Sequence, residues 1–171
     1  CRNFKIWQKK ELPPFIISVN ISAKQFYQID FVDKIICALQ EYDIDPLWLC
    51  LEITESLALK NFEYTAKTIN HLRENGINIA IDDFGTGYSS LNYLARLQVN
   101  SIKIDKSLIH NLTSDDKKKK ITKAMIDLGK TLGLEVTAEG IETIEELQCL
   151  NKLKCHKAQG FLISKPLSKS R

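Results

Sequence analysis

The sequence lacks the features that mark several large classes of protein. No apolar run approaches the roughly 20 residues that a membrane-spanning helix needs, and the N-terminus lacks the layout of a signal peptide. The five cysteines are scattered and have no C-x-x-C spacing, which is typical of reduced thiols and fits a structural zinc site poorly. A formal net charge of +3 is too small to indicate a nucleic-acid polymer as partner. We therefore expect a cytoplasmic globular protein without membrane contact.

What the sequence does contain is an alternation of strand-like and helix-like runs. Its 171 residues, 44% hydrophobic and 26% charged, have the size and composition of one globular domain, 1–171. Because each parallel strand return needs a crossover, the alternation predicts an α/β fold with a parallel sheet. Strands are predicted at 15–21, 47–53, 77–81, 99–104, 134–138 and 158–163. Helices are predicted at 31–39, 62–74, 90–97 and 144–150, and from Ser114 as N-cap to Gly133.

Each predicted strand carries a polar, ligand-capable residue at or near its C-terminal end. One polar residue at a strand end can arise by chance, but the same feature at the C-terminal end of all six strands is not explained by chance. In a closed parallel barrel the C-terminal strand ends converge on one mouth, whereas an open doubly wound sheet uses only a few of them. The barrel therefore explains more of the pattern. The six residues are Asn20, Glu52, Asp82, Lys103, Glu139 and Gln159.

Two adjacent carboxylates, Asp82 and Asp83, follow the third predicted strand and precede Gly85 and Gly87. Two carboxylates this close repel each other unless a cation lies beside them. In proteins that cation is usually one or two divalent metal ions. Adjacent strand residues point to opposite faces, so both can meet one metal centre only if the strand breaks, and the glycines would supply the break. The alternative is a plain strand-to-helix turn, with Asp83 or Thr86 capping the next helix.

The strand-end side chains suit a particular chemistry. Four carboxylates and one amide form an all-oxygen donor set that suits Mg²⁺ or Mn²⁺, and none of the three histidines ends a strand. Lys103 would stay protonated beside these acids, with Asp105 on its face, and could stabilise an attacking hydroxide or a developing phosphoryl charge. Two ions about 4 Å apart would clamp both oxygens of an in-line displacement. The alternative explanation of Lys103 is a buried ion pair inside a barrel.

Six segments, spread in order over nearly the whole chain, carry the motifs of a known family. Together they resemble the EAL domain family, phosphodiesterases that hydrolyse the bacterial second messenger cyclic di-GMP. The segments are 18–22 (SVNIS), 51–56 (LEITES), 82–91 (DDFGTGYSSL), 103–107 (KIDKS), 138–143 (AEGIET) and 159–161 (QGF).

The resemblance implies a TIM-like (β/α) barrel that uses two Mg²⁺ or Mn²⁺ ions to open cyclic di-GMP into linear pGpG. It implies a catalytic set in which Lys103 positions or activates the hydrolytic water, Asp83 takes part, and Glu55 anchors the loop after the paired aspartates. That loop is tied in the family to metal binding and dimer contacts. The family's metal positions match Asn20, Glu52, Asp82 (expected to bridge), Asp83 and Glu139. Its further active-site and substrate-supporting positions match Asp105, Glu142 and Gln159.

One departure from the family is the absence of its Glu-Ala-Leu tripeptide. Residues 1–8 resemble the helix after the strand that carries it, so we expect a chain with about six of the eight barrel strands, incomplete at its N-terminus. The family's missing glutamate is a metal ligand, and the arginine just beyond it contacts substrate phosphate. We therefore expect a competent parent protein and an inactive or nearly inactive 171-residue chain. Unpaired sheet edges beside 15–21 and 158–163 would favour self-association, such as a homodimer.

Two other functions fit parts of the pattern. A non-catalytic cyclic di-GMP receptor would bind the nucleotide without cutting it. Degenerate receptors usually lose metal ligands or the lysine, whereas here the lysine and every metal ligand that follows the missing strands are present. An enolase-like Mg²⁺ lyase would share the carboxylates and the lysine, but it fits Asn20 and the paired aspartates poorly. Regulatory domains in the parent protein are a further expected partner.

Overall fold

The computed structural model describes residues 15–87 and 91–167. The resemblance of residues 1–8 to a helix lies outside the described residues. The chain divides into two compact units. The first comprises Cys1–Ala80 with Ser90–Asn100, and the second comprises Ile81–Ser89 with Ser101–Arg171.

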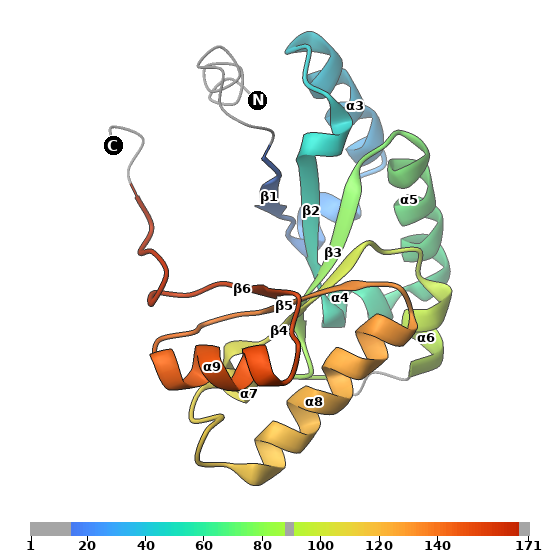
Figure 1. Cartoon of the computed structure of the whole chain (residues 1–171). Coiled ribbons are helices and arrows are strands. Elements are labelled where there is room, and N and C mark those ends of the chain that lie inside the picture. Colours follow the sequence, from blue (N-terminus) through green and yellow to red (C-terminus); the bar gives the residue numbers. More distant parts are fainter. Residues whose placement is uncertain (1–14, 88–90, 168–171) are drawn as a thin grey trace. The chain divides into compact units, whose positions relative to one another are not determined.

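A strand lies in each of the six regions where the sequence predicts one, and the strands follow one another in chain order (Figure 1). The pairs β1–β2, β4–β5 and β5–β6 are parallel, which confirms the predicted α/β alternation. β3 begins in the first unit and ends in the second. The bounds are β1 Ile17–Asn20, β2 Leu49–Thr54, β3 Asn78–Phe84, β4 Ser101–Ile104, β5 Glu135–Ala138 and β6 Lys157–Ala158.

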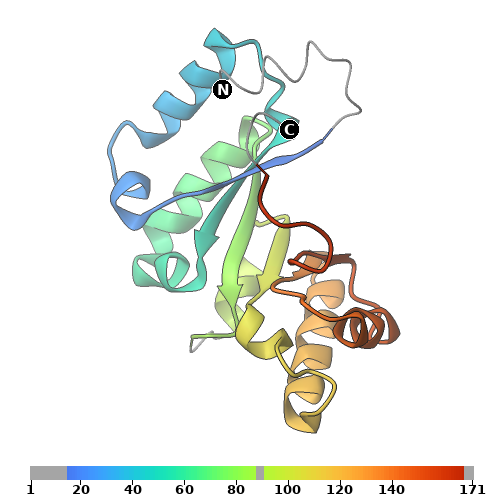
Figure 2. The ribbon, with the colours of Figure 1, turned by 90° about the vertical axis from the view of Figure 1, so that its left-hand side faces the viewer.

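In the first unit, α3 and α5 lie next to each other (Figures 1 and 2). The Asn61 side chain accepts a hydrogen bond from the N–H of Tyr64 at the start of α5, and Gly76, with φ 80°, follows its end. Ile69 and Leu72, three residues apart on α5, are fully buried, and burial of each contributes about 1.5–3 kcal/mol. The helices of this unit are α2 Ala23–Phe26, α3 Phe31–Glu41, α4 Glu55–Lys60, α5 Phe62–Glu74 and α6 Leu91–Arg96, with a 3₁₀ turn at Pro46–Trp48.

In the second unit, the long helix α8 packs on β4 and β5. Gly129 permits the close approach, because a Cβ there would lie 2.3 Å from Cγ2 of Val136. Ile126 on α8 and Ile102 on β4 are fully buried in the same core. The helices are α7 Lys106–Ile109, α8 Asp116–Thr131 and α9 Ile144–Lys152. Among the described residues of either unit, no helix is long and apolar enough to cross a membrane.

The start of α8 differs from the prediction by one residue. Asp115, not Ser114, is the N-cap, and its carboxylate accepts hydrogen bonds from the N–H groups of Lys117 at 2.9 Å and Lys118 at 3.0 Å. Ser114 instead donates its hydroxyl to the carbonyl of Asn111 in the preceding turn. A carboxylate that accepts two N–H groups at the positive end of a helix is the stronger cap, which explains the shift.

The sixth strand is much shorter than predicted. β6 covers only Lys157–Ala158, because the chain then turns over the backbone of Ile141. A Cβ on Gly160 would lie 2.1 Å from the carbonyl oxygen of Ile141, and the N–H of Ile163 bonds back to Gly160 at 3.0 Å. Of the predicted strand 158–163, only Ala158 belongs to β6, and the residues after it form the turn, in which Phe161 is exposed.

Candidate functional site

A buried lysine lies between two carboxylates in the second unit. Lys103, on β4, is 7% exposed. Its Nζ lies 2.5 Å from Oε1 of Glu139 and 3.6 Å from Oδ1 of Asp82. An ammonium group loses most of its hydration at such depth, so it needs opposite charges within reach, and these two carboxylates supply them.

The alternation of β4 explains why this lysine faces the carboxylates. Ile102 and Ile104 point to the opposite face of the strand from Lys103, and both are fully buried. Lys103 is in register with Thr137 on β5, so Glu139, two residues further on, lies on the same face just beyond the strand end. The N–H of Glu139 donates a hydrogen bond to the carbonyl of Ile104 at 3.1 Å, so the backbone pairing of β4 and β5 continues as far as Glu139.

The paired aspartates lie near the C-terminal end of β3, where the backbone departs from regular strand geometry. Asp83 has φ 54°, a left-handed conformation that is unusual for a residue other than glycine. Its N–H donates to Oδ1 of Asp82 at 3.1 Å, and its carbonyl accepts from the N–H of Thr86 at 3.3 Å and the hydroxyl of Thr86 at 2.9 Å. β3 ends just before Gly85, as we predicted from the glycines, and Gly85 has φ 101°, but the backbone already departs from strand geometry at Asp83.

In the first unit, the structure places Asn20 and Glu52 side by side. They are register partners on the parallel strands β1 and β2, and the N–H of Ile21 bonds to the carbonyl of Glu52 at 2.9 Å. Glu52 is buried, whereas Asn20 is exposed. Glu55 is also buried and is the first residue of α4, whose N-cap, Thr54, accepts from the N–H of Leu57. The predicted set of Asn20, Glu52 and Glu55 thus belongs to one local arrangement.

The three predicted supporting residues lie at strand ends or in loops of the second unit. Asp105 caps α7 by accepting from the N–H of Ser107 at 2.8 Å, so this carboxylate has a structural partner of its own. Gln159 follows β6, and its side chain is exposed while its backbone N–H bonds to the carbonyl of Ala138 at 2.9 Å. Glu142 is exposed in the loop between β5 and α9.

One residue that the sequence interpretation missed holds this loop in place. Glu146, on α9, is 3% exposed, and its Oε1 accepts from the N–H of Asn111 at 3.1 Å. Its Oε2 accepts from the N–H groups of Glu142 at 3.1 Å and Thr143 at 3.2 Å. The Thr143-x-x-Glu146 capping-box spacing was visible in the sequence, but the contact with Asn111, 35 residues away, was not.

Replacing Glu146 with alanine should destabilise the protein by about 3 kcal/mol or more, because three backbone N–H groups would lose their acceptor. Urea unfolding measures the loss, and hydrogen exchange of the amides of Asn111, Glu142 and Thr143 should accelerate. Glu145→Gln, at the exposed neighbouring position, is the matched control and should change stability by less than about 0.5 kcal/mol. Equal effects of the two variants would contradict the positioning role of Glu146.

The donor chemistry of the second unit fits a hard divalent cation, since Asp82, Asp83 and Glu139 offer only carboxylate oxygens. Across residues 15–87 and 91–167, however, no three His, Cys, Asp or Glu side chains are grouped closely enough to hold an ion. Asp82 and Glu139 both face the Lys103 ammonium instead. An ion would therefore join or displace a positive charge that is already present.

A family model described as the EAL domain matches residues 1–166. The chain belongs to the EAL domain family. MucR of Pseudomonas aeruginosa, named as a bifunctional diguanylate cyclase and cyclic di-GMP phosphodiesterase, is 40% identical over 98% of the chain and 24% of its own length. The chain covers only 21–24% of the first curated relatives that it matches.

Solved structures of EAL domains share the fold. The MucR phosphodiesterase in complex with cyclic di-GMP is similar with a TM-score of 0.94 and 40% identity, over 98% of this chain and 68% of that one. BlrP1 of Klebsiella pneumoniae, solved with manganese and cyclic di-GMP, is similar with a TM-score of 0.88 and 30% identity, over 97% and 43%. These similarities confirm the predicted fold class, a TIM-like (β/α) barrel, of which the described residues supply six strands.

Proposed function

We propose that this EAL domain is the catalytic module of a phosphodiesterase that hydrolyses cyclic di-GMP to linear pGpG with the help of divalent metal ions. The observation that carries the proposal is the buried Lys103 with its two carboxylate partners, Asp82 and Glu139. A buried cation fixed at strand ends in an acidic setting suits the charge that develops when water attacks a phosphodiester. The relatives named as cyclic di-GMP phosphodiesterases support the choice of substrate.

The chain's own residues would divide the chemistry as follows. Lys103 would hold the attacking water and favour its deprotonation, because its ammonium charge stabilises hydroxide. Asp82 and Glu139 keep Lys103 in place and charged. Bound Mg²⁺ or Mn²⁺ would lower the pKa of water and neutralise charge on phosphoryl oxygens. The assignment of metal ligands rests on the family motifs and stays a proposal for each of Asn20, Glu52, Asp82, Asp83 and Glu139.

The remaining predicted residues would support the reaction. Glu55 would anchor the loop after the paired aspartates, and Asp83 would act within the catalytic set. Asp105, Glu142 and Gln159 would support the substrate. Glu142 and Gln159 both have an exposed side chain on a backbone whose N–H is hydrogen-bonded, which leaves the side chain accessible to a ligand. A homodimer and a location in the bacterial cytoplasm complete the proposal, and sedimentation would test the first.

A cyclic di-GMP receptor that does not cut its ligand is the second candidate. It is favoured by the short contact of 2.5 Å between Lys103 and Glu139, because a carboxylate already neutralised by lysine is a poorer metal ligand. It is opposed by the presence of the lysine and of every motif position named above.

The deciding experiment incubates cyclic di-GMP with Mg²⁺ or Mn²⁺ and either the full-length natural protein or the 171-residue chain, and separates products by chromatography. We expect pGpG from the full-length protein, loss of product with chelator, and little or no turnover by the 171-residue chain. Turnover by the short chain would correct that last expectation. Binding without turnover in both proteins would establish the receptor, and neither binding nor turnover would refute both candidates.

A further inference from the structure

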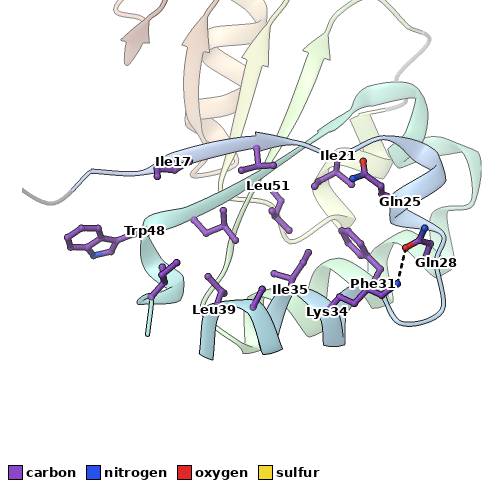
Figure 3. A pocket seen from close by; sticks show the side chains of 14 residues that line it. Ile17, Ile21, Gln25, Gln28, Phe31, Lys34, Ile35, Leu39, Trp48 and Leu51 are labelled. Atoms are coloured by element: carbon purple, nitrogen blue, oxygen red, sulfur yellow. Dashed lines mark hydrogen bonds between the residues drawn. The ribbon is translucent and has the colours of Figure 1, made fainter. Parts of the chain in front are cut away.

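An apolar groove of about 370 Å³ lies in the first unit, between β1, β2 and α3, and Figure 3 shows the side chains that line it. The polar groups of its lining already have partners. The side chain of Lys34 donates to that of Gln28 at 3.4 Å, and the hydroxyl of Ser22 donates to the side chain of Gln25 at 2.7 Å. The groove therefore adds no reactive group to those of the candidate site.

The second unit contains a buried carboxylate that the proposed hydrolysis does not use. Glu146, on α9, is 3% exposed, and its two oxygens accept hydrogen bonds from three backbone N–H groups. Oε2 accepts from Thr143 in the capping box of α9, and also from Glu142. Oε1 accepts from Asn111 at 3.1 Å, and a capping box does not need this bond. The bond to Asn111 therefore has a role other than capping.

The bond to Asn111 joins the two chain segments that carry the ion pair of the candidate site. Lys103 lies near the end of β4, and the chain continues from it through α7 to Asn111. Glu139 follows β5 directly, and the chain continues from it to Thr143, the N-cap of α9. Glu146 thus links the same two segments that the 2.5 Å contact between Lys103 and Glu139 links within the site.

The segment between Glu139 and α9 is held closely along its length. Gly140, with φ 69°, lies against the first turn of α7, since a Cβ there would be 2.4 Å from Cβ of Lys106. The N–H of Ile141 donates to the carbonyl of Gln159 at 3.1 Å, and Ile141 is fully buried. Such a segment passes a displacement at one end to the other. The acceptor at its far end therefore influences where the Glu139 carboxylate lies.

A carboxylate suits this link better than the other side chains of similar length. It offers two acceptor oxygens and no donor, which matches N–H groups that arrive from both segments. Glutamine has one acceptor oxygen, and its amide NH₂ would face an N–H donor on one side. Alanine would leave all three N–H groups without this acceptor, which costs more than the loss of one.

We propose that Glu146 is a positioning residue, which holds the segment after β5 to the segment after β4 and so keeps the Glu139 carboxylate on the ammonium group of Lys103. The catalytic consequence rests on the proposed function, in which Lys103 holds the attacking water. Glu146 acts through Glu139 and Lys103 and is not itself a catalytic residue.

The side-chain NMR signal of Lys103 tests the positioning role in the 171-residue chain with isotope-labelled lysine. A buried ammonium group bonded to a carboxylate exchanges its protons slowly, and the loss of its signal in Lys103→Arg assigns it. Glu146→Ala should accelerate this exchange by about 10-fold or more, and Glu146→Gln should accelerate it less. Leu72→Ala, which removes a fully buried side chain in the first unit, is the control for a loss of stability alone.

Hydrolysis by the full-length protein tests the catalytic consequence. Glu146→Ala should lower kcat for cyclic di-GMP by about 10–100-fold with little change in KM, because a misplaced reacting group lowers the rate without removing substrate contacts. Glu146→Gln should recover part of the lost kcat, and Leu72→Ala should keep the wild-type kcat per folded molecule. Wild-type kcat in a variant with accelerated exchange would remove the catalytic consequence.

The exchange measurement can overturn the positioning role by itself. Wild-type exchange of the Lys103 ammonium in folded Glu146→Ala would do so, and if that variant does not fold, the same result in Glu146→Gln would. Equal acceleration in Glu146→Ala and Leu72→Ala, compared at equal folded fraction, would show that Glu146 only supports the fold. A wild-type full-length protein that makes no pGpG would refute the proposed function, and the exchange of Lys103 would still decide the positioning role.

Discussion

Replacing Lys103 with methionine should destabilise the protein by about 3–5 kcal/mol, because it removes the buried cation that balances two carboxylates. Methionine has a similar length and fills the same space, so little of the loss would come from a cavity. Asp82 and Glu139 would be left close together without their shared partner. Stabilities of folded domains lie near 5–15 kcal/mol, so this loss is a large fraction of the total.

The neighbouring strands offer a matched control. Lys157 on β6 pairs with Glu135 on β5 at 2.7 Å, but these side chains are 54% and 44% exposed. Lys157→Met should therefore cost less than about 1 kcal/mol. Urea unfolding of both variants measures the difference. Similar losses of stability in the two variants would show that the buried ion pairs of Lys103 stabilise the protein no more than the exposed pair does.

Lys103→Met should also lower the rate of cyclic di-GMP hydrolysis by about 10²–10⁴-fold in the full-length protein, measured at temperatures where the variant is folded. A loss confined to kcat would support the role of Lys103 toward water, because a lysine that only held the fold would change the folded fraction instead. Lys103→Arg keeps the charge and should recover stability more than activity. Full activity in the methionine variant would remove Lys103 from the catalytic set.

The fold could be predicted from the sequence wherever a run was long and periodic. α5 has the predicted bounds, because thirteen residues show one apolar face between Asn61 and Gly76. Short elements were missed, since the six residues of α4 and the four of α7 are too few to show a period. β6 was overpredicted because apolar content at 158–163 does not reveal the turn that Gly160 makes over Ile141.

The candidate site was predictable to the extent that strand ends and alternation determine it. The side chains of Asp82, Lys103 and Glu139 meet as expected, because alternation on β3 and β4 and the register of β5 bring them to one face. Both explanations of Lys103, catalytic group and buried ion pair, fit the observed contacts. The role of Glu146 could not be predicted, because its carboxylate oxygens accept hydrogen bonds from two loops that lie close together only in the folded protein.

The left-handed backbone at Asp83 was also beyond the sequence, and it separates the two explanations of the paired aspartates. Aspartate, asparagine and glycine tolerate a φ of 54°, whereas alanine there costs about 1–2 kcal/mol. Asp83→Asn and Asp83→Gly should therefore keep the turn, and Asp83→Ala should lose stability. If the carboxylate serves only the turn, the first two variants should keep their activity.

We expect instead that Asp83→Asn and Asp83→Gly both fold and both lose more than about 100-fold in hydrolysis, since even outer-shell partners of a metal are worth 10–100-fold. Thr86→Ala supplies the converse control, because it removes the hydroxyl bond to the Asp83 carbonyl at 2.9 Å and leaves both carboxylates intact. It should cost about 1 kcal/mol and keep hydrolysis nearly unchanged. Urea unfolding and pGpG production, measured on the same four variants of the full-length protein, distinguish the turn from the carboxylate. An active glycine variant would leave Asp83 with only its role in the left-handed backbone near the end of β3.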